Sequence, residues 1–203
     1  MNRFDIAALT WDEKPLRVEL VKNVTEKIKE LIPLDKSMKV LDFGCGTGLL
    51  SFFLHPYVKE ITGVDTSKGM IDVFEKKIKE GKVENIRCFN LDIYKDKLPE
   101  KYDLIVSSMV FHHIEDINQI LKILYSYLHE GGYIAIADLV KEDGSFHDDN
   151  EGVIHFGFDL SMLENQLRNV GFKDNKSEIA YVVKKKRDGK EKEYPIFVMV
   201  GKK

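Results

Sequence analysis

Three glycines and two acidic residues near the start of the chain have types and spacing that suit binding of a nucleotide. The glycines alternate with other residues at Gly44, Gly46 and Gly48, and Asp42 and Asp65 lie on either side of them. Glycine lets the backbone turn tightly and approach a ligand closely, because it has no Cβ. An acidic side chain at the tip of the next strand can bind both hydroxyl groups of a ribose. The pattern therefore predicts a nucleotide site.

The spacing of the glycines indicates which kind of nucleotide the loop binds. A dinucleotide loop has the pattern G-x-G-x-x-G, but Leu49 stands where the last glycine of that pattern belongs. Asp42, ahead of the glycines, would repel a pyrophosphate and would suit a ligand with a cationic ammonium group. A nicotinamide-dependent oxidoreductase, which shares the same layout, is therefore the weaker prediction.

The elements that must position these residues alternate along the chain. Apolar residues at helical spacing predict a helix over residues 16–31, ahead of the first strand. Short apolar runs predict strands over residues 38–43, 60–64, 86–91, 102–107 and 133–139. Further helices are predicted over residues 49–54, 67–81, 117–128 and 160–170. Gly131 and Gly132 are predicted to turn the chain into the fifth strand.

The last third of the chain predicts a different arrangement. Residues 140–158 are polar and irregular, and a loop this long is typical of a functional segment. Residues 179–185 and 195–200 alternate loosely as strands, and Asp188-Gly189 between them is a hairpin signal. The sheet is therefore predicted to finish in an antiparallel hairpin.

Composition argues against several classes of protein. The 203 residues suit one domain, and 31 basic against 34 acidic residues give a net charge of −3, which offers no electrostatic reason to bind nucleic acid. Cys45 and Cys88 have no disulfide-framework spacing, so a reducing compartment fits. We find no signal-peptide pattern and no run of about 20 apolar residues that would span a membrane. A cytoplasmic location without a membrane partner is expected.

With this loop, its acidic residues and this order of elements, the chain resembles the class I S-adenosylmethionine-dependent methyltransferases over nearly its whole length. The resemblance implies an α/β, Rossmann-like doubly wound sheet of seven strands in the order 3-2-1-4-5-7-6, with strand seven antiparallel and an N-terminal helix added. Residues 1–203 would form a single domain, in which residues 1–35 make an N-terminal lid and helix and residues 140–158 a loop on the substrate side. The implied cofactor is S-adenosyl-L-methionine, and the implied product is S-adenosyl-L-homocysteine.

The resemblance also implies roles for individual residues. The three glycines would pass beneath the methionine part of the cofactor, Asp42 would orient its amino group, and Asp65 would hold the ribose. Six residues that follow the second, third and fourth strands would border the adenosine and the methyl group: Thr66, Met70, Asp92, Ile93, Ser108 and Met109. Trp11 would cover the cofactor as part of a lid. Met70 and Trp11 could instead be a core residue and a hydrophobic staple, and Asp92 a turn residue.

Three histidines are candidates for a general base. His147 and His155 lie in the irregular segment, and His113 follows the fourth strand. A histidine there could take a proton from a thiol, hydroxyl or amine near neutral pH. Alternatively, His147 and His155 lie on a surface loop, and His113 belongs to a structural turn. Two histidines without a third ligand are weak grounds for a metal, so no metal site is predicted.

The predicted function is methyl transfer from S-adenosylmethionine to a small molecule, at an oxygen, nitrogen, sulfur or carbon atom. The segment after the fourth strand lacks the Asn/Asp-Pro-Pro-Tyr/Phe motif of enzymes that methylate base amino groups. An RNA or protein methyltransferase, or a non-catalytic protein that binds the cofactor, remains an alternative. The sequence does not indicate the acceptor or the oligomeric state.

Overall fold

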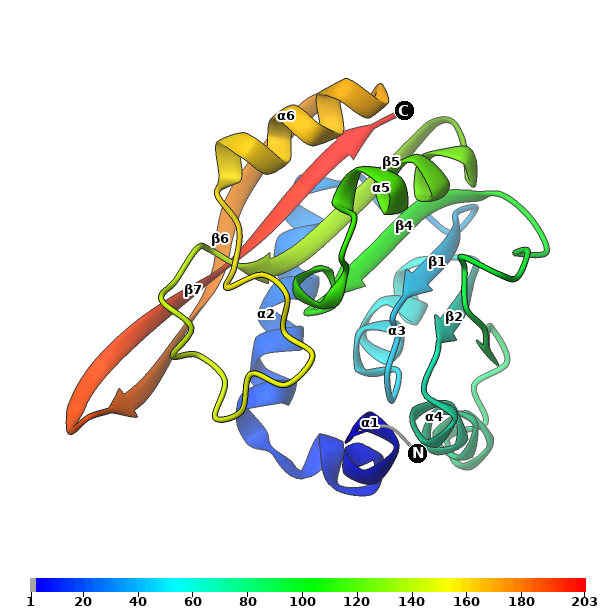
Figure 1. Ribbon diagram of the computed structural model, residues 1–203. Coiled ribbons are helices and arrows are strands. Elements are labelled where there is room, and N and C mark those ends of the chain that lie inside the picture. The colour runs from blue at the N-terminus through cyan, green and yellow to red at the C-terminus, as the bar shows by residue number, and fades with distance from the viewer. Residues whose placement is uncertain (1–2) are drawn as a thin grey trace.

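The computed structural model describes residues 3–203, which form one seven-stranded sheet with helices on both faces (Figure 1). The strand order is β3-β2-β1-β4-β5-β7-β6. Neighbours from β3 to β5 are parallel, whereas β7 is antiparallel to both β5 and β6. The strands are β1 (Lys39–Phe43), β2 (Glu60–Asp65), β3 (Ile86–Asn90), β4 (Tyr102–Ser108), β5 (Leu128–Leu139), β6 (Lys173–Arg187) and β7 (Lys190–Lys202). The predicted fold class and strand order are confirmed.

Helices cover the two faces of the sheet in two separate groups. The α-helices are α1 (Arg3–Ala7), α2 (Pro15–Leu31), α3 (Leu49–Leu54), α4 (Lys68–Gly81), α5 (Ile117–Ser126) and α6 (Leu160–Val170). The short 3-10 helices are η1 (Ala8–Glu13), η2 (His55–Tyr57) and η3 (Phe111–His113). Apolar residues of α2, α3 and α4 form one core with one face of the sheet, and those of α5 and α6 form a second core with the other.

Burial on both faces explains why the central strands are short apolar runs. Val40 of β1 belongs to one core and Leu41, its neighbour, to the other, because successive side chains point to opposite faces. Three helices begin at side-chain caps: Ser67, Asp116 and Asp159 each accept a hydrogen bond from the backbone N–H three residues on. Because β1 is parallel to both β2 and β4, the carboxyl ends of these three strands lie at one edge of the sheet.

The predicted boundary between α5 and β5 is wrong. Strand β5 begins at Leu128 rather than at residue 133, and α5 ends at Ser126. Tyr102 pairs with Leu128 and Leu104 with Tyr133, so the chain between these pairs bulges out of register. Gly131 and Gly132 therefore form a bulge inside the strand rather than a turn ahead of it, and Gly131 has the positive φ of +80° that this bulge requires.

The C-terminal hairpin is confirmed but is much longer than predicted. Arg187 pairs with Lys190 across the two-residue turn Asp188-Gly189, and both turn residues have positive φ. In Figure 1 the tip of β6 and β7 runs well past the rest of the sheet. The residues near the tip are mostly charged, so the alternation of apolar residues does not reveal that the strands extend this far. Among residues 3–203, no helix is long and apolar enough to cross a bilayer.

Candidate functional site

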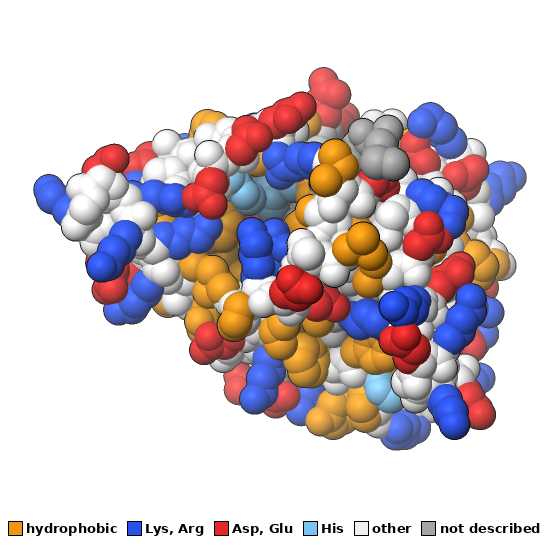
Figure 2. Space-filling view, turned by 90° about the horizontal axis from the view of Figure 1, so that it is seen from below, with side chains coloured by type: hydrophobic (Ala, Val, Ile, Leu, Met, Phe, Trp, Pro, Cys, Tyr) orange, Lys and Arg blue, Asp and Glu red, His pale blue; other side chains and the backbone are white. Residues whose placement is uncertain are grey.

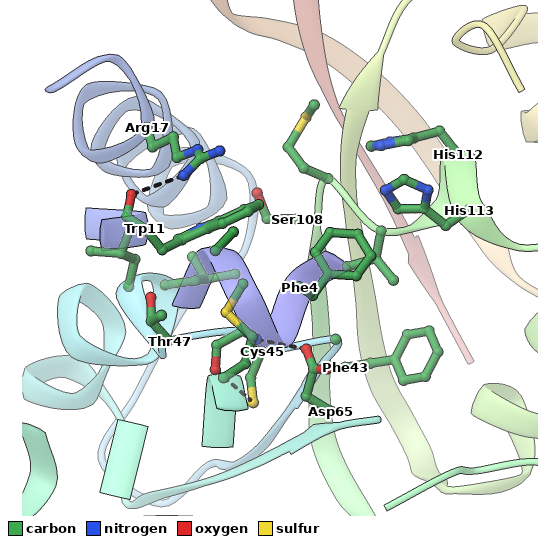
Figure 3. A pocket seen from close by; sticks show the side chains of 18 of the residues that line it. Phe4, Trp11, Arg17, Phe43, Cys45, Thr47, Asp65, Ser108, His112 and His113 are labelled. Atoms are coloured by element: carbon green, nitrogen blue, oxygen red, sulfur yellow. Dashed lines mark hydrogen bonds between the residues drawn. The ribbon is translucent and has the colours of Figure 1, made fainter. Parts of the chain in front are cut away.

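A cavity of about 660 Å³ opens at the carboxyl ends of β1, β2, β3 and β4. Ligands bind at this edge in open α/β sheets, because the strand order reverses there, between β1 and β4. Figure 3 shows that the wall is built from distant parts of the chain: Phe4, Trp11 and Arg17 come from the N-terminal segment, and Asp65 lies opposite them at the tip of β2. A volume of this size is typical of a pocket for a small ligand.

Most of the predicted site residues line this one cavity. They are Trp11, Asp42, Gly44, Gly46, Asp65, Thr66, Met70, Asp92, Ile93, Ser108, Met109, His113 and His147. Two predicted residues, Gly48 and His155, do not line it. Other lining residues were given no site role by the sequence, among them Arg17, Phe146 and Lys185.

The glycine loop is held over the tip of β2 by its own backbone. Gly44 and Cys45 both donate from their backbone N–H to the carbonyl of Val64, at 2.9 and 3.1 Å. A Cβ placed on Gly46 would meet only the sulfur of Met70, at 3.9 Å, so the backbone of Gly46 faces open space in the cavity. A ligand can therefore approach this backbone closely.

Gly48 has a packing role instead of the predicted contact with the ligand. Its φ is +81°, and a Cβ there would lie 2.1 Å from the ring of Phe74. The ring is fully buried on α4, which packs directly against the end of the loop. Glycine is needed at this position because α4 comes so close and because the backbone is left-handed.

A buried carboxylate, Asp42, and a half-buried one, Asp65, lie at the tips of β1 and β2. Asp65 accepts hydrogen bonds from the backbone N–H of Gly46 at 2.9 Å and of Ser67 at 2.8 Å, which orient its side chain. Burial raises the pKa of Asp65 although these bonds favour the charged form. Asp42 accepts a bond of 2.6 Å from the hydroxyl of Ser51, and burial raises the pKa of Asp42 to about 7.

The next two strand ends contribute polar and strained groups. Asp92 accepts from the Nζ of Lys95 at 2.7 Å and from the backbone N–H of Tyr94, so its carboxylate also stabilises the turn after β3. The hydroxyl of Ser108 is buried and has no hydrogen-bond partner among the described residues. Met109 follows with a φ of +60°, an uncommon conformation for a side chain of this size.

The N-terminal segment is fastened across the cavity by polar contacts. The hydroxyl of Ser67 and the backbone N–H of Gly69 both donate to Asp5, at 2.7 and 3.0 Å, which ties α1 to the start of α4. Asp12 accepts from the hydroxyl of Thr47 at 2.6 Å, which ties η1 to the glycine loop. This arrangement places Trp11 over the cavity.

A cluster of aromatic rings and one guanidinium extends this cover. The guanidinium of Arg17 lies 3.5 Å from the centre of the Trp11 ring and donates to the backbone carbonyl of Trp11 at 3.1 Å. The ring of Phe4 lies edge-on to His113 with centroids 5.3 Å apart. Figure 3 shows Phe4 reaching from α1 toward the two histidines of η3.

Three histidines meet on the side of the cavity away from β2. The centroid of the His112 ring is 4.0 Å from that of His113 and 5.0 Å from that of His147. Asp138, which is buried at the end of β5, accepts from Nδ1 of His112 at 2.8 Å and from its backbone N–H at 3.1 Å. The carboxylate thus fixes the orientation of the His112 ring.

His113 and His147 are both neutral at neutral pH. Burial, together with the neighbouring His112, lowers the pKa of each to about 4. Nδ1 of His113 donates to the carbonyl of Gly152 at 2.6 Å, which leaves its Nε2 as an acceptor. Nε2 of His147 is buried without a partner in the described part of the chain.

His155 is turned away from the cavity, which contradicts the expectation that it faces the pocket. Its Nε2 donates to the carbonyl of Ile114 at 2.8 Å, and its ring packs on Phe158. The cause is the backbone, because Ile154 and His155 both donate to the carbonyl of His112 and so fold this part of the segment against η3. Within residues 3–203, no group of three or more His, Cys, Asp or Glu side chains is arranged to hold a metal ion.

Comparison with known proteins places this geometry in a family. The family model described as a methyltransferase domain matches residues 34–199. An uncharacterized methyltransferase of Schizosaccharomyces pombe is 33% identical over 65% of this chain and 52% of its own length. The malonyl-[acyl-carrier protein] O-methyltransferase of Bacillus anthracis is 24% identical over 83% of this chain and 60% of its own length. The chain thus matches only about half to three fifths of these relatives.

A solved structure shows the same fold. Phosphoethanolamine N-methyltransferase 2 of Haemonchus contortus, in complex with S-adenosyl-L-methionine, superposes with a TM-score of 0.73 at 15% identity. The match covers 100% of this chain and 60% of that one. At this level of identity the likeness concerns the fold.

Proposed function

Since this chain belongs to the class I S-adenosylmethionine-dependent methyltransferases, we propose that it methylates a small molecule in the cavity described above. One observation supports the proposal: the same cavity is lined by the strand-end carboxylates, by His147 and Lys185, and by Phe4 and Trp11 of the N-terminal segment. A small acceptor fits such an enclosure better than a folded RNA or protein does. The two named relatives, an O-methyltransferase and an N-methyltransferase, differ in the acceptor atom, so that atom stays open.

The residues present fit the cofactor of the family. The hydroxyl of Ser108 has no hydrogen-bond partner among the described residues, and the backbone of Gly46 faces open space in the cavity. Both groups could therefore contact a bound cofactor. We assign the ribose hydroxyls to Asp65, whose carboxylate is already oriented by two backbone N–H groups, and the ammonium group to Asp42. The remaining predicted residues would border the adenosine and methionine parts, namely Gly44, Thr66, Met70, Asp92, Ile93, Met109 and Trp11.

For methyl transfer, the protein has mainly to position the acceptor and the cofactor and to exclude water. When bound, S-adenosylmethionine supplies a methyl group on a positively charged sulfur, open to in-line attack by a nucleophile. The segment from α1 to η1 covers the cavity, so that water is excluded and the acceptor is held in place. An O–H, S–H or N–H acceptor must also lose a proton, and we assign that proton to Nε2 of His147, which is neutral and has no other partner in the described chain.

Binding of S-adenosylhomocysteine is expected to strengthen as the pH rises from about 5.5 to 7 and then to level off. Burial raises the pKa of Asp42 to about 7 in the free protein, so at lower pH the carboxyl is protonated and attracts an ammonium group weakly. The ammonium favours the ionised form, so binding releases a proton, and affinity falls by up to about tenfold per unit below pH 7. Calorimetric titrations at several pH values, in buffers of different ionisation enthalpy, measure both the affinity and the number of protons released on binding.

Asp42→Asn is the control for this pH dependence, because it removes the titrating group and keeps the shape of the side chain. In this variant the affinity should be lower and should change less with pH than in the wild type; what change remains is expected from Asp65, whose pKa is also raised. His113 and His147 titrate near pH 4 and do not contribute in this range. A wild-type affinity that does not change between pH 5.5 and 7 would show that Asp42 does not bind the ammonium group.

Label from a methyl-labelled cofactor should enter the small-molecule fraction of a cell extract, rather than its RNA or protein fraction. His147→Gln should lower the initial rate by about a hundredfold or more, because general-base catalysis contributes that much, while S-adenosylhomocysteine binds as before. The measurement is labelled product per fraction over time, with wild type and variant side by side.

One outcome would contradict the small-molecule acceptor, and another would contradict the role of His147. Label in RNA or protein alone would reject a small-molecule acceptor. An unchanged rate in His147→Gln would remove His147 from the mechanism and leave the methyl transfer itself in place.

A further inference from the structure

Basic residues gather in the part of the cavity near His147 and Lys185, which we call the acceptor compartment. Four cationic residues line the cavity, namely Arg3, Lys14, Arg17 and Lys185. They come from α1, from the start of α2 and from β6, whereas three of the lining carboxylates, Asp42, Asp65 and Asp92, lie at or just after the ends of β1, β2 and β3. Figure 2 shows Lys and Arg side chains gathered around a hollow in which histidine is visible.

Among these four cations, Lys185 is the best candidate to bind an anionic ligand, because it is partly buried and has no carboxylate partner within residues 3–203. Its Nζ donates to the backbone carbonyl of Phe146 at 2.7 Å and lies 4.1 Å from the centre of the Phe146 ring. An ammonium group has three N–H donors, so two remain for a ligand. Among the described residues, no carboxylate comes within ion-pair distance of it, and burial lowers its pKa. A partly buried cation without a counter-ion is costly, and an anion in the cavity would offset that cost.

The other charges around Lys185 do not neutralise it. Asp148, the carboxylate with the strongest effect on it, is 83% exposed and is bound to Arg187 at 2.7 Å. Asp149 also lines the cavity, but its side chain accepts from the backbone N–H of Glu151 in an exposed turn. Lys14, Arg17 and Arg187 add repulsion. The local field therefore favours an incoming anion.

Lys185 lies close to His147, the base that we propose for methyl transfer. Phe146, which binds the ammonium of Lys185, directly precedes His147, and Lys185 is close enough to lower the pKa of His147. Arg17 is less available, because its guanidinium is stacked on the Trp11 ring and bonded to the Trp11 carbonyl. An acceptor held by Lys185 would thus lie beside the proposed base.

We propose that the methyl acceptor is an anion, and that its carboxylate or phosphate group is bound by Lys185 while its nucleophilic atom lies near His147. This inference rests on the proposed function, because it names the substrate class of the same cavity. The aromatic rings of Phe4 and Phe146 in this compartment suit an acceptor with an apolar body.

The test is titration of the protein saturated with S-adenosylhomocysteine by benzoate, by phenyl phosphate and by benzamide. Benzamide has the shape of benzoate without its charge. Both anions should bind at least about tenfold more tightly than benzamide, since a hydrogen bond to a charged group is worth that much or more. The ratio of benzoate to phenyl phosphate affinity tells a carboxylate site from a phosphate site.

Lys185→Gln and Lys186→Gln are a matched pair of variants. Both remove one positive charge from the same strand, but Lys186 is exposed and does not line the cavity. Lys185→Gln should lose at least about tenfold in affinity for the anions and bind benzamide and S-adenosylhomocysteine as the wild type does. Lys186→Gln should match the wild type with every ligand.

The outcomes separate this inference from the proposed function. A wild-type protein that does not bind S-adenosylhomocysteine contradicts the proposed function. If it does bind, equal affinity for benzoate, phenyl phosphate and benzamide overturns the anionic acceptor, and so do equal losses in the two variants. Lys185→Gln that loses S-adenosylhomocysteine as strongly as benzoate would place Lys185 on the cofactor and would also overturn the inference.

Discussion

Asp65→Asn is expected to lower the affinity for S-adenosylhomocysteine by at least about a hundredfold. The carboxylate accepts from the backbone N–H groups of Gly46 and Ser67 and retains lone pairs for the two ribose hydroxyls. An asparagine must direct an NH₂ group toward one of these donors, so it disturbs the loop and loses charge-assisted bonds. Such bonds contribute about 1.5–3 kcal/mol each, and about 1.4 kcal/mol corresponds to tenfold. Calorimetric titration of both proteins measures the loss.

The fold should survive this substitution, which makes the result easy to interpret. Burial raises the pKa of Asp65, so the folded protein does not rely on its charge for stability. Thermal unfolding of the variant should confirm this. Asp72→Asn is the matched control, because Asp72 lies on the exposed face of α4 in an ion pair with Lys68. If Asp65→Asn binds S-adenosylhomocysteine within threefold of the wild type, the assignment of the ribose to Asp65 is wrong.

Gly48→Ala is expected to destabilise the protein by about 3 kcal/mol, far more than the usual surface substitution. The added Cβ would lie 2.1 Å from the ring of Phe74, and the ring cannot move freely because it is fully buried and packs against Phe52. Overpacking costs about 1–3 kcal/mol, and the left-handed backbone adds about 1–2 kcal/mol. The melting temperature should fall by about 6–12 °C for a chain of this length.

Gly152→Ala separates the two causes. Gly152 also has a positive φ, of +71°, but a Cβ there would meet no atom within 4 Å. This variant should therefore lose only the backbone part, about 1–2 kcal/mol. Scanning calorimetry of both variants provides the comparison. Equal melting temperatures for Gly48→Ala and Gly152→Ala would mean that contact with Phe74 does not determine the need for glycine.

Local sequence signals were sufficient to predict the sheet and to propose the residues that bind the cofactor. The strands are apolar runs and the helices have periodic apolar faces and side-chain caps, all of which are local signals. Asp42, Gly44, Gly46 and Asp65 lie within 24 residues of one another, so one strand-loop-helix-strand unit brings them together without help from the rest of the chain. Gly48 shows the limit of the motif, because its requirement comes from a ring on α4.

The residues that we propose for the acceptor could not be predicted from local patterns. Lys185, His147 and Phe4 are far apart in the sequence and line one cavity, because β6 packs on α2 and residues 140–158 contact α1 through Arg3 and Glu151. The ammonium of Lys185 and the ring of His113 are held by the backbone carbonyls of Phe146 and Gly152, which no side-chain pattern reveals. His155 points away for the same reason. A motif records what neighbouring residues need locally, whereas the surroundings of a histidine or lysine are set by chain segments that become neighbours only on folding.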